Sequence, residues 1–276
     1  MNGAQSLLQT LVNCEVEVCF GNPGTSEMHF VAALDSVPQM RSVLCLFEGV
    51  VTGAADGYGR VAGKPAATLL HLGPGLANGL ANLHNARRAS TPLVNIVGDH
   101  ATYHLQYDAP LTSDIVGFAR PVSSWIHESK SADGVASDAA RAVQAARCAP
   151  GCVSTRILPA DTAWNEAQRA EQKLPDLLPT PVSSNAIDAA ARLLSNGRKT
   201  ALLLRGASLY GAGLEAAGRV QAKTGARLLC DTFAPRAELG AGRVPVERIP
   251  YFAEQIVDFL KDFEQIVFVG AKPPVS

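Results

Sequence analysis

The sequence predicts an α/β protein of two doubly wound parallel-sheet domains, the second of which we expect to be incomplete. Three observations support this fold class. Short, continuous apolar runs recur along the chain, longer amphipathic segments separate them, and one polar, proline-rich stretch interrupts the pattern. Continuous apolar strands that alternate with helices are typical of a parallel sheet covered on both faces.

The first domain is predicted over residues 1–160, where the alternation is clearest. Its strands are expected at the short apolar runs 17–21, 41–47, 66–71, 92–97 and 152–158. Its helices are expected at the amphipathic segments 4–14, 49–62, 76–87 and 131–147, with one more beginning at residue 25 or 26. The hydroxyl of Thr25 or Ser26 can cap that helix, and Glu27 lies in its first turn, where the helix dipole favours an acid.

The segment 161–183 is polar and rich in proline, which is typical of a linker. The alternation resumes in a second domain over 184–276. Its expected elements are helices at 185–194, 214–224 and 251–263 and strands at 200–204, 227–229 and 265–270. The chain stops directly after the last of these strands, and we therefore expect the second domain to be incomplete.

The composition narrows the class of protein. Hydrophobic residues make up 47% and charged residues 18%, which suffices for a sizeable core. A formal net charge of -1 and a pI near 6.6 argue against a nucleic-acid or anionic-membrane partner. We predict a soluble cytoplasmic protein, because no apolar run approaches a membrane span and the start lacks a signal-peptide pattern. The cysteines form neither a CxxC pair nor a zinc pattern, and Cys19 and Cys45 are expected to be buried thiols.

Three turns between a predicted strand and the next helix carry polar side chains. The first is GNPGTSE, from Gly21 to Glu27; the second places Glu48 directly after an apolar strand; the third is HLGPG, from His71 to Gly75. Ordinary turn chemistry can explain each turn alone. Ligands of open parallel sheets bind at the carboxyl ends of the strands, where these turns together place an acid, a hydroxyl and an imidazole.

The first domain contains, in this order, GNPGTSE, LFEGVVTGAADGYGR, LLHLGPGLANGLANLHNA and TPLVNIVGD. In order and spacing these motifs resemble the N-terminal domain of the thiamine diphosphate (ThDP)-dependent 2-keto acid enzymes. That family includes acetolactate synthase, benzoylformate decarboxylase and pyruvate decarboxylase. The resemblance implies that 1–160 binds the aminopyrimidine of ThDP, and that 184–276 is part of the family's central, Rossmann-like domain.

The resemblance implies a role for each turn. Glu48 matches the glutamate that hydrogen-bonds N1′ of the aminopyrimidine and so activates the cofactor. His71 matches a histidine of benzoylformate decarboxylase-like members that contacts the substrate and handles its protons, which makes Glu48 and His71 the catalytic candidates. Thr25 matches a serine that binds the substrate carboxylate, and Ser26 is the adjacent alternative. The residues expected to bind the cofactor lie in or beside these turns: Pro23, Gly24, Glu48, Gly73, Pro74, Gly75 and Asn78.

Each of these assignments has an alternative that needs no ligand. Glu48 can stabilise the start of the helix that follows it, and His71 can be a core histidine whose hydrogen bonds are satisfied. A helix cap explains Thr25 or Ser26 without any substrate.

The family's diphosphate-binding domain carries Gly-Asp-Gly and an Asn-Asn or similar pair, which hold Mg²⁺. Here the only Gly-Asp pair, Gly98-Asp99, continues to His100, and no Asn-Asn occurs. We therefore place no metal ligand in this chain. We expect a diphosphate-binding domain, from a missing C-terminal part or from another chain, to complete the ThDP and Mg²⁺ site. His100, Tyr103 and His104 are expected to be surface loop residues, since their spacing differs from that of the histidine pair in pyruvate decarboxylases.

The function that the resemblance implies is the N-terminal portion of a ThDP-dependent 2-keto acid carboligase or decarboxylase. The run Gly73-Pro74-Gly75 favours an acetolactate synthase-like enzyme, and His71 keeps a benzoylformate decarboxylase-like enzyme as the alternative. Alternatives of another class are one subunit of a split enzyme and a non-catalytic binding or scaffold protein on the same fold. The family's shared sites imply a homodimer or homotetramer. FAD is not expected, because the chain has no strong dinucleotide fingerprint.

Overall fold

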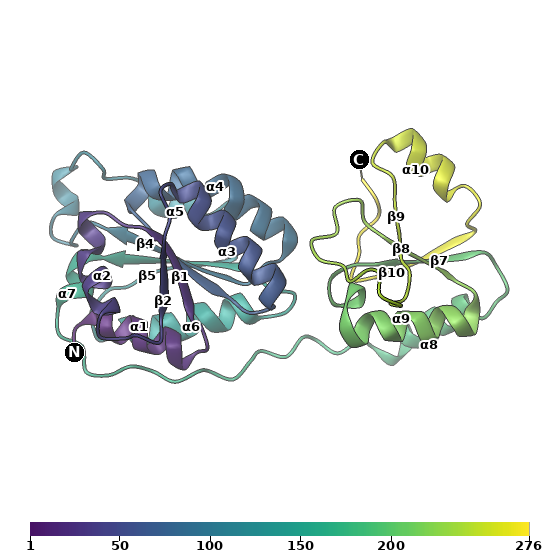
Figure 1. The fold of residues 1–276 in the computed structure, drawn as a ribbon, viewed down its shortest axis with the longest axis horizontal. Helices are drawn as coiled ribbons and strands as arrows, with labels where there is room; N and C mark the ends of the chain where they lie inside the picture. The colour runs from purple at the N-terminus through teal and green to yellow at the C-terminus, as the bar shows by residue number, and fades with distance from the viewer. Residues whose placement is uncertain (276) are drawn as a thin grey trace. The chain divides into compact units, whose positions relative to one another are not determined.

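The computed structural model describes residues 1–275. They form two compact units, residues 1–179 and 180–275. Each unit has its own parallel sheet with helices on both faces (Figure 1), which confirms the predicted α/β class. The domain and linker boundaries drawn from the sequence stay predictions. Residues 166–179 lie on the first unit, where the carbonyl of Arg169 accepts a hydrogen bond from Ser6.

The sheet of the first unit has the order β2-β1-β3-β4-β6-β5, and all neighbouring strands are parallel. The strands are β1 (Val18–Asn22), β2 (Arg41–Leu44), β3 (Ala66–Leu70), β4 (Leu93–Asp99), β5 (Trp125–Glu128) and β6 (Val153–Pro159). Every residue of β3, β4 and β6 is buried, which explains their largely apolar sequences without alternation. Polar residues of these strands bond to one another: Thr68 donates to Asn95, which donates to Thr155.

A hydrophobic cluster lies on each face of this sheet. One face is covered by α1 (Gly3–Asn13), α2 (Met28–Leu34), α6 (Val135–Arg147) and α7 (Ala160–Trp164). The other face is covered by α3 (Glu48–Ala62), α4 (Leu72–Ala89) and α5 (Ile115–Ala119). The alanine-rich α6 packs against α1, because its small side chains allow the two helices to approach.

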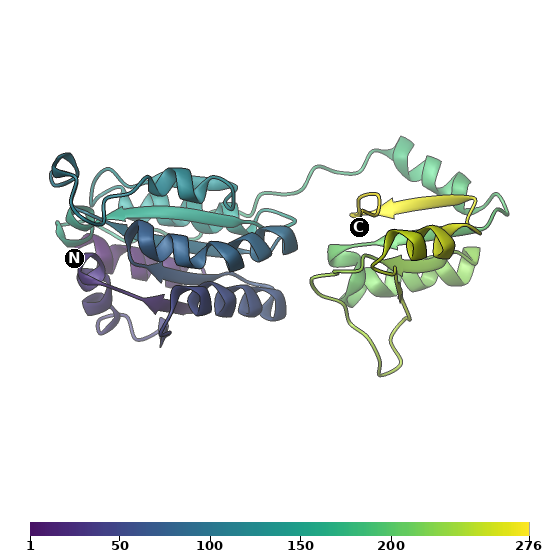
Figure 2. The same cartoon turned by 90° about the horizontal axis from the view of Figure 1, so that it is seen from above.

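The second unit has the strand order β10-β7-β8-β9, again parallel (Figures 1 and 2). Its strands are β7 (Thr200–Leu204), β8 (Arg227–Cys230), β9 (Glu247–Arg248) and β10 (Gln265–Val269). Its helices are α8 (Ser184–Leu194), α9 (Gly211–Thr224) and α10 (Ala253–Leu260). Side chains of α8 and α9 pack on one face of the sheet and those of α10 on the other.

Several short elements were not predicted. They are β5, β9, α5 and α7, together with the 3₁₀ helices η2 (Leu105–Tyr107) and η3 (Gly206–Leu209). The helix predicted to begin at residue 25 or 26 begins as the 3₁₀ helix η1 (Thr25–Glu27), which α2 continues. β5 is only half-buried and β9 has two exposed residues, and so neither gives a continuous apolar run.

The start of α4 and the cap of the helical segment after β1 differ from the prediction. α4 begins at Leu72, and Gly73-Pro74-Gly75 therefore lies in its first turn rather than in a preceding loop. Proline is tolerated there, because first-turn N–H groups have no partner within a helix. The predicted hydroxyl cap at residue 25 or 26 is wrong, since no side chain caps η1 or α2. Instead the carboxylate of Glu27 accepts a hydrogen bond from the backbone N–H of Gly24.

Candidate active site

The carboxyl ends of β1, β2, β3 and β4 lie at one edge of the first sheet. β1 stands between β2 and β3; the chain leaves β1 through α2 on one face and passes from β2 to β3 through α3 on the other. Such a change of face leaves a crevice at the strand ends, where ligands of open α/β sheets bind. Glu27 follows β1, Glu48 follows β2 and His71 follows β3, so the topology brings all three to this edge.

Glu48 is the first residue of α3 and is half-buried. The side-chain amide of Asn78 donates a hydrogen bond to its Oε2 over 3.0 Å. A Cβ added to Gly75 would lie 3.3 Å from Oε1, so a side chain at this position would crowd the carboxylate. The structure therefore brings together Glu48, Gly75 and Asn78, three of the residues predicted to bind the cofactor.

Direct contacts between α3 and α4 hold Glu48 in place. The hydroxyl of Thr52 donates to the carbonyl of Gly79 over 3.0 Å, and the amide of Asn82 donates to the carbonyl of Gly49 over 2.7 Å. A Cβ on Gly79 would lie 2.8 Å from the methyl group of Thr52, so the absence of a side chain there permits the close approach. These bonds join the first half of α3 to the middle of α4, and so hold Glu48 relative to Asn78.

Glu27 is a buried acid, with 1% of its surface exposed. Its Oε2 accepts the hydrogen bond from Gly24 N over 2.8 Å and lies 2.7 Å from Nδ1 of His71. Burial raises the pKa of Glu27, while the hydrogen bond from Gly24 and the neighbouring His71 act in the opposite direction. The imidazole of His71 keeps 23% of its side chain exposed, and so the pair joins a buried carboxylate to an accessible imidazole.

Two glycines make room for this pair. A Cβ on Gly24 would overlap the ring of His71, and a Cβ on Gly98, near the end of β4, would overlap the carboxylate of Glu27. Gly24, in the first of the three predicted turns, is therefore required because His71 packs directly against it.

The other predicted residues lie around these two groups. Thr25 is exposed and Ser26 half-buried in η1, and Pro23 is half-buried in the same loop. Gly73 packs against the side chain of Ser113 in the segment between β4 and α5. Together with Pro74 it forms the start of α4.

From the sequence we interpreted Glu27 only as an acid in the first turn of a helix and did not predict its contact with His71. Its position three residues after Gly24 is typical of a carboxylate that accepts a hydrogen bond from the backbone at the start of the helix. The tertiary fold, however, decides that this carboxylate points inward to His71. The surface prediction holds for His104, which is exposed, and is wrong for His100, which is half-buried with a buried Nε2.

Residues 1–118 match the family described as thiamine pyrophosphate enzyme, N-terminal TPP binding domain. Residues 1–118 belong to the thiamine pyrophosphate (ThDP) enzyme family. The match includes Glu27, Glu48 and His71, and it confirms the family predicted from the four motifs.

The curated relatives that the chain matches are longer than it is. The chain is 53% identical over 277 residues to IlvX of Mycobacterium tuberculosis, a candidate acetolactate synthase large subunit by name, and covers 53% of it. It is 33% identical over 181 residues, 65% of the chain, to benzoylformate decarboxylase of Pseudomonas aeruginosa, covering 33% of that enzyme. The chain therefore spans about half the length of these relatives or less.

The fold also matches a solved structure, the ThDP-dependent 4-hydroxybenzoylformate decarboxylase of Rhodococcus jostii RHA1. The TM-score is 0.84 at 21% sequence identity, over 100% of this chain and 53% of that one. At this identity the likeness shows the fold alone.

Among residues 1–275, no helix is both long and apolar enough to cross a membrane. Within the same range, no group of three or more His, Cys, Asp or Glu side chains is arranged to hold a metal ion. All six cysteines are free thiols, and Cys19 and Cys45 are buried as predicted.

The buried Glu27 predicts a pH dependence of stability. Because its pKa is raised on folding, the folded state binds the proton more tightly than the unfolded state. The contribution of Glu27 to the free energy of unfolding should therefore be fully present below its ordinary pKa of 4.5, and should be lost as the pH rises through the raised pKa. Relative to Glu27→Gln, which does not titrate, the wild type should lose stability over this window. Urea unfolding at several pH values measures the difference.

Glu254→Gln is the matched control, since it removes an exposed glutamate from the first turn of α10. The free energy of unfolding of the wild type is compared with that of Glu27→Gln at each pH. If this difference stays constant, or shifts in favour of the wild type as the pH rises, the burial of the carboxyl group is contradicted.

Proposed function

We propose that this chain forms the aminopyrimidine-binding part of a ThDP-dependent enzyme that removes CO₂ from a 2-keto acid. One observation carries the proposal: the Glu48–Asn78 hydrogen bond and the Glu27–His71 pair lie at the same edge of one parallel sheet. The family of residues 1–118 supports it, as do relatives named for acetolactate synthase and benzoylformate decarboxylase.

The residues at this edge fit an aminopyrimidine. A ring nitrogen of such a group needs a carboxyl partner that is held still and not crowded. The bond from Asn78 holds Oε2 of Glu48, and the missing side chain of Gly75 keeps the space beside Oε1 open. When bound, ThDP supplies a nucleophilic carbon for the keto group and an electron sink for the loss of CO₂. Glu48 shares a proton with the pyrimidine nitrogen and so sets its protonation state.

The substrate side of the site is assigned to His71, Thr25 and Ser26. Glu27 accepts the Nδ1 hydrogen of His71, which orients the ring. The Nε2 atom then delivers a proton to the carbon that loses CO₂. The hydroxyls of Thr25 and Ser26, which cap no helix, bind the substrate carboxylate.

The fate of the substrate carbon separates two functions. Protonation releases an aldehyde and makes the enzyme a decarboxylase; addition to a second carbonyl makes it a synthase. The Glu27–His71 pair supplies a proton donor and favours the decarboxylase. The 53% identity to IlvX favours acetolactate synthase as the second candidate.

The diphosphate and Mg²⁺ are assigned to residues outside this chain. The sequence has no Gly-Asp-Gly motif, and among residues 1–275 there is no cluster of metal ligands. A diphosphate-binding domain, on a longer form of the chain or on another chain of an oligomer, completes the site.

In the assembled enzyme, Glu48→Gln should slow H/D exchange at the reactive carbon of ThDP by about 10² or more, because the amide cannot share the proton with the pyrimidine nitrogen. Exchange is followed by NMR of the cofactor after acid quench. Glu254→Gln serves as the control. Ordinary exchange in Glu48→Gln would refute the assignment and favour a non-catalytic protein on this fold.

His71→Ala should lower the rate of aldehyde release by about 10² to 10⁴, because the donor of the final proton is lost. Condensation of two keto acids should suffer less, since it requires no protonation of that carbon. Product analysis by NMR measures both rates, with the exposed His84→Ala as the control. An unchanged rate of aldehyde release would remove His71 from the proton step.

A further inference from the structure

Two polar atoms near the site are buried and have no protein hydrogen-bond partner among residues 1–275. They are Oε1 of Glu27 and Nε2 of His100. Buried carboxylate oxygens and imidazole nitrogens are almost always hydrogen-bonded in folded proteins, so each needs a partner. A carboxylate oxygen only accepts, and an imidazole N–H donates, so the two atoms are complementary.

The fold brings these atoms to one face of β4. A Cβ on Gly98 would overlap Oε1 of Glu27, so position 98 faces that carboxylate. His100 comes two residues later, directly after the end of β4, and alternation along an extended strand directs it to the same face. The 3₁₀ helix that contains Glu27 packs on β4 at this point.

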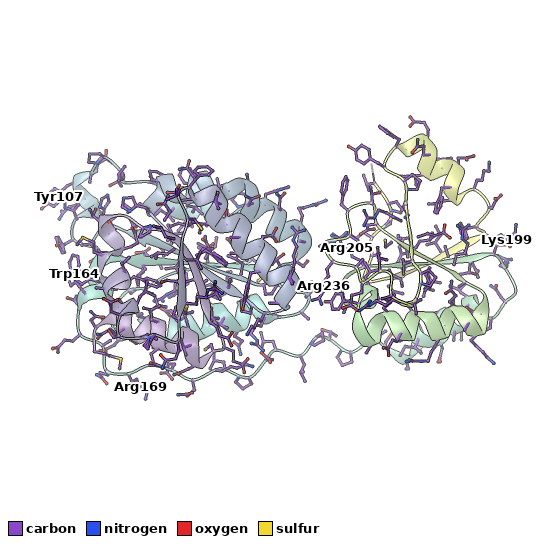
Figure 3. All side chains as sticks on the ribbon, viewed as in Figure 1. Tyr107, Trp164, Arg169, Lys199, Arg205 and Arg236 are labelled. Carbon is purple, nitrogen blue, oxygen red and sulfur yellow. The ribbon has the colours of Figure 1, made fainter. Side chains whose placement is uncertain are left out.

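The ring of His100 also contacts a second imidazole. It packs edge-on against His104, with ring centroids 5.4 Å apart, and His104 in turn packs against Tyr107 at 5.7 Å. His104 and Tyr107 are exposed, and Figure 3 shows Tyr107 and Trp164 at the same end of the first unit. The backbone N–H of His100 donates to the carboxylate of Asp99 over 2.7 Å, which fixes the start of this loop.

We propose that His100 is a positioning residue whose Nε2–H binds Oε1 of Glu27 through one bound water and so holds the carboxylate toward His71. Glu27 then bridges two imidazoles: His71 on Oε2 and His100 on Oε1. The inference rests on the proposed function for its catalytic meaning, because a fixed Glu27 is what orients His71 as the proton donor. The arrangement itself involves no cofactor and can be tested without one.

The test follows the titration of the Glu27 side-chain carboxyl carbon by ¹³C NMR in the chain itself. The groups that act on this carboxyl are the Gly24 and Glu27 backbone N–H groups and His71. His100→Leu removes a donor to the ionised form and should raise the proton affinity of Glu27 about tenfold. His100→Gln keeps a donor and should restore most of the wild-type value. His84→Leu, at an exposed position of α4, should change nothing.

An unchanged Glu27 titration in folded His100→Leu would overturn the proposal, and so would a His100→Gln variant that behaves like His100→Leu. The wild type gives a second test that needs no variant. Long-range ¹H–¹⁵N NMR should show a proton on Nε2 of His100; a ring whose only proton is on Nδ1 would have nothing to donate from Nε2 and would refute the bond. ThDP is absent from both measurements. The role of His100 can therefore be refuted while the proposed function stands, and the proposed function can be refuted while the role of His100 stands.

Discussion

The hydrogen bond between buried Glu27 and His71 is the constraint on which the candidate site depends. An ionised carboxylate without partners is costly in a protein interior, so the fold must surround it with donors. The backbone of Gly24 supplies one, and Nδ1 of His71, which follows the neighbouring strand β3, lies 2.7 Å from the same oxygen. The same closeness excludes side chains at Gly24 and Gly98. The Glu27–His71 pair therefore explains why positions 24 and 98 are glycine.

The parallel sheet places this pair beside the other residues of the candidate site. Because all its strands run in one direction, residues distant in sequence reach the same edge, where Glu48 follows β2 and His71 follows β3. The packing of α3 on α4 fixes Glu48 against Asn78, while Glu27 fixes His71. The two acids thus have different surroundings: Glu48 is half-buried and approachable, and Glu27 is enclosed. Different surroundings let two carboxyl groups of one type serve different chemistry.

The sequence predicted the long and strongly patterned parts of this molecule. Buried strands such as β4 and the motif around Glu48 could be recognised because burial on both faces and turn chemistry leave direct traces in the sequence. The half-buried β5 and the two-residue β9 leave none. Glu27 was taken for a helix-end acid and His100 for a surface residue, because the direction of a side chain after a turn depends on its tertiary neighbours. The start of α4 was misplaced because Gly-Pro-Gly is commoner in loops than in the first turn of a helix.

The proposed binding of the aminopyrimidine of ThDP at Glu48, at the carboxyl ends of the first sheet's strands, can be tested by a ¹H–¹⁵N NMR titration of the chain with ThDP. We expect shift changes at Glu48, Gly75 and Asn78 that disappear in Glu48→Gln. Shift changes centred on the second unit, or a response that Glu48→Gln leaves intact, would contradict it.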